Sequence, residues 1–190
     1  MKSKLSEFLQ KPAFMVAPLL LGCILEREVN GKLIRVKIVE TEAYDETDAA
    51  SHSYKGKTPR TEIMFGEPGH LYVYFTYGMH YCCNIVTDFE GSGSAVLIRA
   101  VEPVEGEDHM RALRPIDGKN ISNGPAKLCK ALGIDKRLNG HDLSKTPLTL
   151  KLAEPLKESK ITQTKRIGIS QSKDLPWRFY ITGNEYVSKV

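Results

Sequence analysis

The chain has 190 residues, of which 41% are hydrophobic and 26% are charged, so it is long enough to build one globular domain around its own core. The longest apolar run, residues 15–25, is about half as long as a bilayer-spanning helix and lacks the basic flank and cleavage pattern of a signal peptide. These features exclude a membrane protein and favour a cytoplasmic one.

The net charge of +4 is unevenly distributed. Residues 1–90 hold 10 Lys and Arg against 12 Asp and Glu, whereas residues 91–190 hold 17 against 11, so the halves carry −2 and +6. A basic second half suits a polyanionic partner such as a nucleic acid, although many proteins with such a surplus bind none.

The spacing of the cysteines and histidines matches no metal-binding motif. The four cysteines are Cys23, the adjacent pair Cys82 and Cys83, and Cys129, and no CxxC motif occurs. The five histidines form no metal-binding pattern with them. We therefore predict a reduced protein that needs no metal and no cofactor.

The first elements in chain order lead to a hairpin. Residues 1–15 are polar and mixed and are expected to form a loosely attached lead-in. A helix is predicted over Ala17–Glu26, with Pro18 tolerated in its first turn. Asn30-Gly31 then gives a strong hairpin signal between residues 25–29 and 33–40. The second strand of this hairpin continues to Tyr44.

That second strand carries the candidate catalytic group. Over residues 36–44 the period of two places Ile38, Glu40, Glu42 and Tyr44 on one face. Glu42 is the candidate general base, because Tyr44 follows on the same face and an acid-rich loop leaves the strand there; Glu40 is its rival. Alternatively, both glutamates form the solvated side of an edge strand.

A second unusual stretch spans residues 71–86. A short helix over 60–65 and a GEPG turn precede it. Alternation places Tyr72, Tyr74 and Thr76 on one face of a strand, and Gly78 marks a bulge or turn that would hold Tyr77 outward. The tyrosines of this stretch either pack in the core or serve as stacking platforms for bases.

The remaining elements complete a strand-rich α+β domain. Strands are predicted over residues 94–103, 147–152, 164–170 and 176–183, and helices over 108–113 and 126–133. Arg99 lies inside an apolar strand and must either pair, with Glu42 as an available partner, or reach water. The helix that begins after SNGP could accept a phosphate together with Lys127, or it is an ordinary capped helix.

Several stretches, in order, resemble the alkyladenine (3-methyladenine) DNA glycosylases of animals and many bacteria. They are VETEAY (39–44), ASHSYKGKTPR (50–60), MFGEPGHLYVYFTYGMHYCCN (64–84), VLIRAVEP (96–103) and GPAKLCKALGI (124–134), followed by RIGIS and RFYITG. Two positions depart from the family pattern: Ala126 replaces a usual glycine, and Asp45 a small or apolar residue.

The resemblance implies one domain over residues 1–190, with a curved, mainly antiparallel sheet that forms a partly open barrel flanked by helices. It implies a monofunctional enzyme of base-excision repair that flips alkylated or deaminated purines out of double-stranded DNA and hydrolyses the N-glycosidic bond. The expected protein is a monomer that needs no cofactor, contacts no membrane and is nucleoid-associated if its source is bacterial.

The resemblance also implies roles for individual residues. Glu42 would activate the attacking water, which Arg99 and the backbone at Ile167 would help to hold. The flipped base would lie between Tyr44 and the pair His52 and Tyr74, next to Asn84, and the backbone at Ala50 and His52 would read its edge. Tyr77 and Met79 would enter the duplex. Lys127, Lys165 and Arg166 could contact DNA phosphates.

Two alternatives remain from the residues themselves. The first is a nucleic-acid-binding module without catalysis, in which Glu42 only pairs with Arg99. The second is a hydrolase of free nucleosides, which would use the same carboxylate on a small substrate. The second leaves Tyr77 and the basic half unexplained, and it predicts no salt-dependent binding to duplex DNA.

Overall fold

The long strand β2 (Lys32–Tyr44) organises the sheet, because it pairs with three other strands. The computed structural model describes residues 4–188. Its other strands are β1 (Ile24–Val29), β3 (Leu71–Thr76), β4 (His80–Val86), β5 (Ala95–Glu105), β6 (Leu148–Lys151), β7 (Ile161–Thr164) and β8 (Arg178–Ile181). The α-helices are α1 (Lys4–Leu9), α2 (Ala13–Leu19), α3 (Glu107–Leu113) and α4 (Pro125–Ala131).

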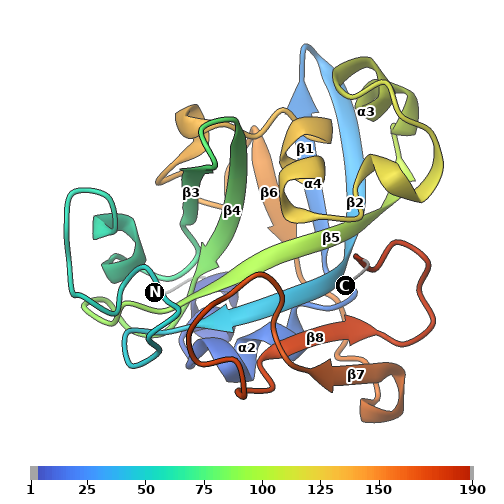
Figure 1. Ribbon diagram of the computed structural model, residues 1–190. Helices are drawn as coiled ribbons and strands as arrows, with labels where there is room; N and C mark the ends of the chain where they lie inside the picture. The colour runs from blue at the N-terminus through green and yellow to red at the C-terminus, as the bar shows by residue number, and fades with distance from the viewer. Residues whose placement is uncertain (1–3, 189–190) are drawn as a thin grey trace.

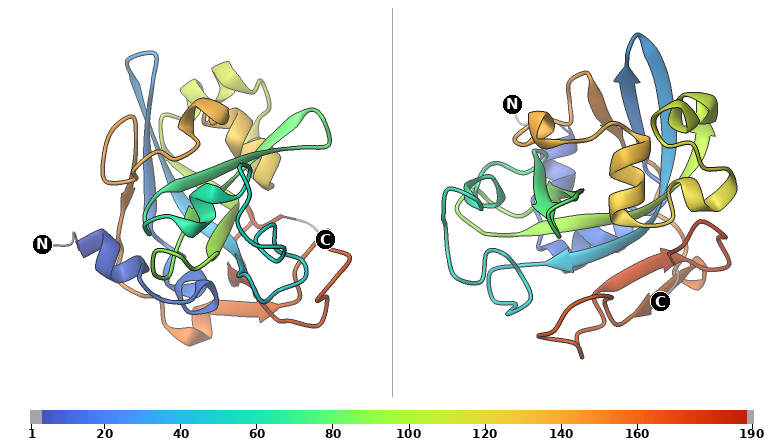
Figure 2. Two further views of the ribbon diagram at one scale, coloured as in Figure 1. Left: turned by 90° about the vertical axis from the view of Figure 1, so that its left-hand side faces the viewer. Right: turned by 45° about the horizontal axis from the view of Figure 1, so that its top comes forward.

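The sheet has the order β3-β4-β5-β2-β1-β6, and β8 joins it by pairing with β2 and with β7. Each of these described pairings is antiparallel. The sheet curls into a half-barrel, with α4 against β4 and β5 and α2 against β2 (Figure 1). The turned views show the same curl and place the β7–β8 ribbon beside the lower part of β2 (Figure 2). The expected α+β fold with a curved antiparallel sheet is confirmed.

Two hairpins form where turn chemistry predicts them. Asn30 and Gly31 have φ of 50° and 71° between β1 and β2, and Tyr77 and Gly78 have φ of 51° and 66° between β3 and β4. Positive φ at both central residues is the geometry of a type I′ turn, whose twist matches that of the flanking strands. The strand over 94–103 and the helices over 108–113 and 126–133 are also present, with bounds shifted by one or two residues.

Near the N-terminus the structure corrects two predictions. The helix expected over Ala17–Glu26 is instead α2, which ends at Leu19, and the chain enters β1 at Ile24 because this segment pairs with β2 and β6. The lead-in expected over residues 1–15 is not loose where it is described. Residues 4–9 form α1, and Leu9 is completely buried in the core; residues 1–3 lie outside the described residues.

Two further corrections concern residues 60–65 and the C-terminal third. Residues 62–65 form a single 3₁₀ turn, η1 (Glu62–Phe65), in place of a helix from residue 60. The three other 3₁₀ turns in the described range are η2 (Gly118–Ile121), η3 (Lys136–Leu138) and η4 (Glu158–Lys160). The strand expected over 164–170 is wrong, because β7 ends at Thr164 and Gly168, with φ of 74°, lies in a loop.

The main core lies under the curled sheet and holds the apolar side chains of β1, β2, β5, α2 and α4. The four cysteines are buried and none forms a disulfide. Within residues 4–188, no helix is long and apolar enough to cross a membrane, and no cluster of His, Cys, Asp and Glu is arranged to hold a metal ion.

Candidate active site

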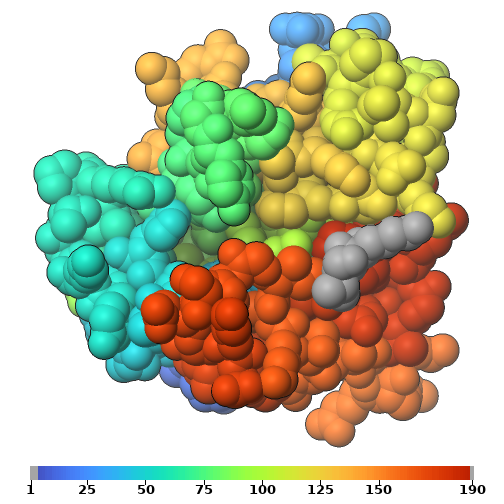
Figure 3. Space-filling view, viewed as in Figure 1, coloured from blue at the N-terminus to red at the C-terminus, as the bar shows by residue number. Residues whose placement is uncertain are grey.

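A cavity of about 460 Å³ opens between the β3–β4 hairpin, the start of α4 and two loops. One loop, residues 49–52, follows β2, and the other, residues 167–171, precedes β8. Figure 3 shows the surface hollowed between the green hairpin, the cyan loop region and the orange-red loop. Four strands contribute to the lining with Tyr44 (β2), Tyr72, Tyr74 and Thr76 (β3), Cys82 and Asn84 (β4), and Leu97 and Arg99 (β5).

A β-bulge in β2 sets the face on which the two glutamates lie. The core contains Ile34, Val36 and Ile38 but then Ala43, so the alternation along β2 shifts by one residue. Between Ile38 and Glu40, β2 has one residue more than β5 opposite, which accounts for this shift. The prediction that Ile38 shares a face with the glutamates is therefore wrong: the bulge turns Glu40 and Glu42 away from the core.

Glu42 is completely buried directly behind the lining residues, with which it forms three hydrogen bonds. Its Oε1 accepts a bond from the backbone N–H of Ile167 at 2.8 Å. Its Oε2 accepts one from the Tyr44 hydroxyl at 2.8 Å and one from Arg99 Nη1 at 3.2 Å. All three donors line the cavity, so the carboxylate is oriented from the side where a substrate would lie.

Glu40 is equally buried but is held by different groups. It accepts hydrogen bonds from Arg178 Nε at 2.6 Å and from the Ser188 backbone N–H at 2.7 Å. Neither of these donors lines the cavity. Burial of both carboxylates contradicts the alternative of a solvated edge strand, and the geometry separates the two rivals by their partners.

Arg99 lies between the two carboxylates. Its Nη1 is 3.2 Å from Glu42 Oε2 and its Nε is 3.3 Å from Glu40 Oε1, while the residue is only 8% exposed. Burial alone would lower the pKa of Arg99, but attraction to Glu42 and Glu40 raises it above its usual value. The predicted pairing with Glu42 is confirmed, and the alternative in which Arg99 reaches water is wrong.

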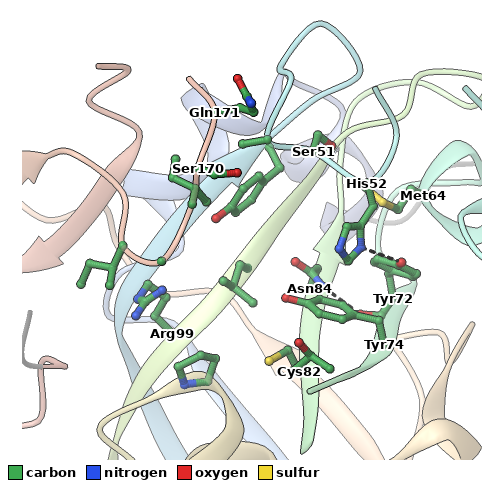
Figure 4. Close-up of a pocket in the computed structure, with 18 of the residues that line it drawn as sticks. Ser51, His52, Met64, Tyr72, Tyr74, Cys82, Asn84, Arg99, Ser170 and Gln171 are labelled. Carbon is green, nitrogen blue, oxygen red and sulfur yellow. Dashed lines mark hydrogen bonds between the residues drawn. The ribbon is translucent and has the colours of Figure 1, made fainter. Parts of the chain in front are cut away.

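Aromatic side chains form the other walls, as Figure 4 shows. The rings of His52 and Tyr74 meet edge to face with centroids 4.5 Å apart, and Nδ1 of His52 lies 3.0 Å from the Tyr72 hydroxyl. Burial and the positive charge of Arg60 lower the pKa of His52 to about 4, so this ring is neutral near pH 7. Burial, the negative charge of Glu42 and the hydrogen bond to it raise the pKa of Tyr44.

The remaining predicted pocket residues also line this cavity. Asn84 Nδ2 donates to the Tyr72 backbone carbonyl at 3.1 Å, which fixes the amide in the wall. Ala50 and Ile167 lie on the two loops at its rim. At the tip of the hairpin, Tyr77 is 83% exposed, as the turn signal predicted, and Met79 is 68% exposed, so both project from the surface.

The three residues predicted to contact phosphates differ in position. Lys127 donates to Asn123 Oδ1 at 2.7 Å within the first turn of α4, and Lys165 forms an exposed ion pair with Asp174 at 2.7 Å. Arg166 is a correction, because its side chain is fully buried in a pair with Asp48 and cannot reach a phosphate in this structure. From the sequence alone, a basic residue in a loop is expected to be exposed. The partner that holds Arg166 in the interior, Asp48, lies 118 residues away in the chain.

Sequence reasoning assigned no role to several residues of the site. Tyr72 is 2% exposed and forms hydrogen bonds with both His52 and Asn84. The alternation that places Tyr72 on the same strand face as Tyr74 was the sequence signal that could have assigned it to the site. Leu97, Ser170 and Gln171 also line the cavity. No local pattern pointed to these three, since they reach it only through the curl of the sheet and the path of the loop before β8.

Residues 7–185 match the methylpurine-DNA glycosylase family. A protein of Carboxydothermus hydrogenoformans named as a 3-methyladenine DNA glycosylase is 54% identical over 187 residues, which covers 96% of this chain and 97% of that protein. Similarly named proteins are 47% identical in Desulfitobacterium hafniense and 47% identical in Methanoculleus marisnigri, each match covering 96% of both chains.

Proposed function

Because this chain belongs to the methylpurine-DNA glycosylase family, which hydrolyses N-glycosyl bonds in DNA, we propose that it releases damaged purines from duplex DNA with Glu42 as the general base. Family membership confirms the resemblance found in the sequence. It also rules against the two alternatives, a binding module without catalysis and a hydrolase of free nucleosides. The roles of individual residues, the flipping of the base and the preference for damaged purines belong to the proposal.

The hydrogen bonding of Glu42 carries the proposal. An ionised carboxylate offers about four lone-pair sites. Ile167, Tyr44 and Arg99 occupy three of them, and the fourth would accept a proton from the attacking water. Because Arg99 is shared with Glu40, its one positive charge faces two carboxylates and orients Glu42 without neutralising it completely.

The chemistry of the bond fits this arrangement. Loss of a purine passes through an oxocarbenium-like sugar, which a buried carboxylate stabilises while it deprotonates the attacking water. A purine alkylated at N3 or N7 is cationic and is therefore a good leaving group. Tyr44 on one side and His52 with Tyr74 on the other would stack against it, and a cation over an aromatic face gains about 0.5–2 kcal/mol. A neutral His52 does not repel such a base.

Duplex DNA would be engaged by the hairpin tip. A base enters such a cavity only after it leaves the helical stack, which costs a few kcal/mol and least for a weakly paired base. Tyr77 and Met79 project beside the cavity and would fill the space that the base vacates. We expect the enzyme to act as a monomer, which sedimentation of the protein with and without duplex would test.

The decisive experiment compares wild type, Glu42→Gln and Glu40→Gln for base release from alkylated duplex DNA and for duplex binding. Glu42→Gln should bind duplex but lose about 10²-fold or more in base release, because an amide is no general base. Glu40→Gln is the comparison variant: it also removes a negative charge beside Arg99 and should lower the free energy of unfolding, yet it should lose much less activity, because the other donors to Glu40, Arg178 and Ser188, lie outside the cavity. Equal loss of activity in both folded variants would contradict the assignment to Glu42.

A further inference from the structure

Arg166 is enclosed between two aromatic rings behind the cavity. Its guanidinium carbon lies 4.5 Å from the centroid of the Tyr44 ring and 5.4 Å from that of Trp177. Its Nη1 donates to the Ala43 carbonyl at 2.8 Å, which ties it to the end of β2. The guanidinium is thus fixed over one face of Tyr44.

Asp48 is the counterion of this guanidinium. Its Oδ2 accepts a hydrogen bond from Arg166 Nη1, and both side chains are fully shielded from solvent. Its Oδ1 accepts the backbone N–H of Ala50 at 3.0 Å, so the same carboxylate also shapes the loop at the cavity rim. Buried charges interact strongly because little water screens them, and the pair as a whole is neutral.

Tyr44 separates this pair from the cavity. The Tyr44 ring lines the cavity, whereas neither Arg166 nor Asp48 does. A base stacked on Tyr44 would therefore have the ring on one side and the ion pair beyond it. The other charges close to Tyr44 are Glu42, which accepts its hydroxyl, and Arg99, which pairs with Glu42.

We propose that the Arg166–Asp48 pair is a positioning unit behind Tyr44 in which Asp48 cancels the charge of the guanidinium, and that this balance preserves the preference of the enzyme for cationic purines over neutral ones. This inference rests on the proposed function. With both partners present, the guanidinium packs against the Tyr44 ring, and the two charges behind the ring cancel. If Asp48 is neutralised, the guanidinium 4.5 Å from the Tyr44 centroid acts on a base stacked beyond the ring, and a partly buried charge at about 8 Å changes the binding of a cation by about tenfold.

The two partners should act in opposite directions, which a purely structural role would not produce. Asp48→Asn leaves an unpaired guanidinium behind Tyr44 and should disfavour a cationic base. Arg166→Gln leaves an unpaired carboxylate and should favour one. The double variant Asp48→Asn/Arg166→Gln removes both charges and should return the preference close to that of wild type.

The test measures kcat/KM for release of 7-methylguanine, which is cationic, and of hypoxanthine, which is neutral, from duplexes of one sequence. We expect the ratio of the two values to fall about tenfold in Asp48→Asn, to rise in Arg166→Gln, and to recover in the double variant. Asp174→Asn is the matched control, because it removes the same charge from the exposed pair with Lys165 and should leave the ratio unchanged.

Equal effects on both lesions, or a double variant that does not restore the ratio, would overturn the inference while leaving the proposed function intact. Release of neither base by wild type would instead overturn the proposed function. Asp48→Asn buries an unpaired charge and can fail to fold; Arg166→Gln and the double variant then decide the question by the same ratio.

Discussion

Replacing Tyr77 by asparagine should separate the stability of the hairpin from its action on DNA. Tyr77 has φ of 51° and is followed by Gly78 at 66°, a turn that favours Asn-Gly and in which a bulky residue is strained. The left-handed conformation costs a residue other than glycine about 1–2 kcal/mol, and asparagine tolerates it better. Because the side chain is 83% exposed, few folded contacts are lost. We therefore expect Tyr77→Asn to raise the free energy of unfolding slightly.

The same change should impair the enzyme on duplex DNA. An aromatic ring stacked in the duplex contributes about 1–3 kcal/mol, so its loss should weaken base flipping by about 5- to 150-fold. Flipping is followed by the fluorescence of 2-aminopurine beside the lesion, and base release is measured on duplex and single-stranded substrate. The single-stranded reaction should change little, because no vacated space needs to be filled.

The other hairpin supplies a control within the same chain. Asn30 has φ of 50° before Gly31 at 71°, far along the sheet from the cavity. Asn30→Tyr should lower the free energy of unfolding by about 1 kcal/mol and leave base release unaltered. Flipping that is unchanged in Tyr77→Asn, or an equal loss on single-stranded substrate, would refute the reasoning about the hairpin tip.

Three further predictions follow from the geometry. Asn84, whose amide is fixed in the cavity wall, would crowd the exocyclic amine of an unmodified guanine. Asn84→Ser should therefore raise the release of unmodified guanine from duplex DNA; no rise in that release refutes this role. Gly93→Ala should destabilise the fold by about 1–3 kcal/mol in urea unfolding, because a Cβ there would lie 2.6 Å from both the Phe65 ring and Ser53 Cβ; an unchanged midpoint would contradict this. In the folded protein the pKa of His52 is lowered from 6.5 to about 4, so between these pH values only the unfolded chain takes up the His52 proton. The free energy of unfolding should therefore fall as pH falls from about 6.5 to about 4. The variant His52→Gln should flatten that slope.

Local signals in the sequence were sufficient for much of the fold. Asn30-Gly31 predicted the first hairpin and Gly78 the second, because few residues besides glycine and asparagine accept positive φ readily. Pro125 and Gly133 bracketed the helix that contains Lys127, and α4 begins at Pro125 and ends two residues before that glycine. The failures near residues 17–26 and 164–170 occurred where a glycine with positive φ ends the regular structure, Gly22 at 89° and Gly168 at 74°. After Gly22, pairing with the distant strands β2 and β6 made residues 24–29 a strand.

The sequence by itself determined the α+β class, the family and the residue types of the site: two glutamates, an arginine and a set of tyrosines. Only the tertiary structure decided which glutamate is held by residues that line the cavity, that Arg99 bridges both, and that Arg166 is buried rather than exposed. The reason is that bulges reset the side-chain alternation, and that the partners lie far apart in the chain. Arg99 is 57 residues from Glu42, and Ser188 is 148 residues from Glu40. Such pairs are selected by the closing of the whole sheet, which no local pattern encodes.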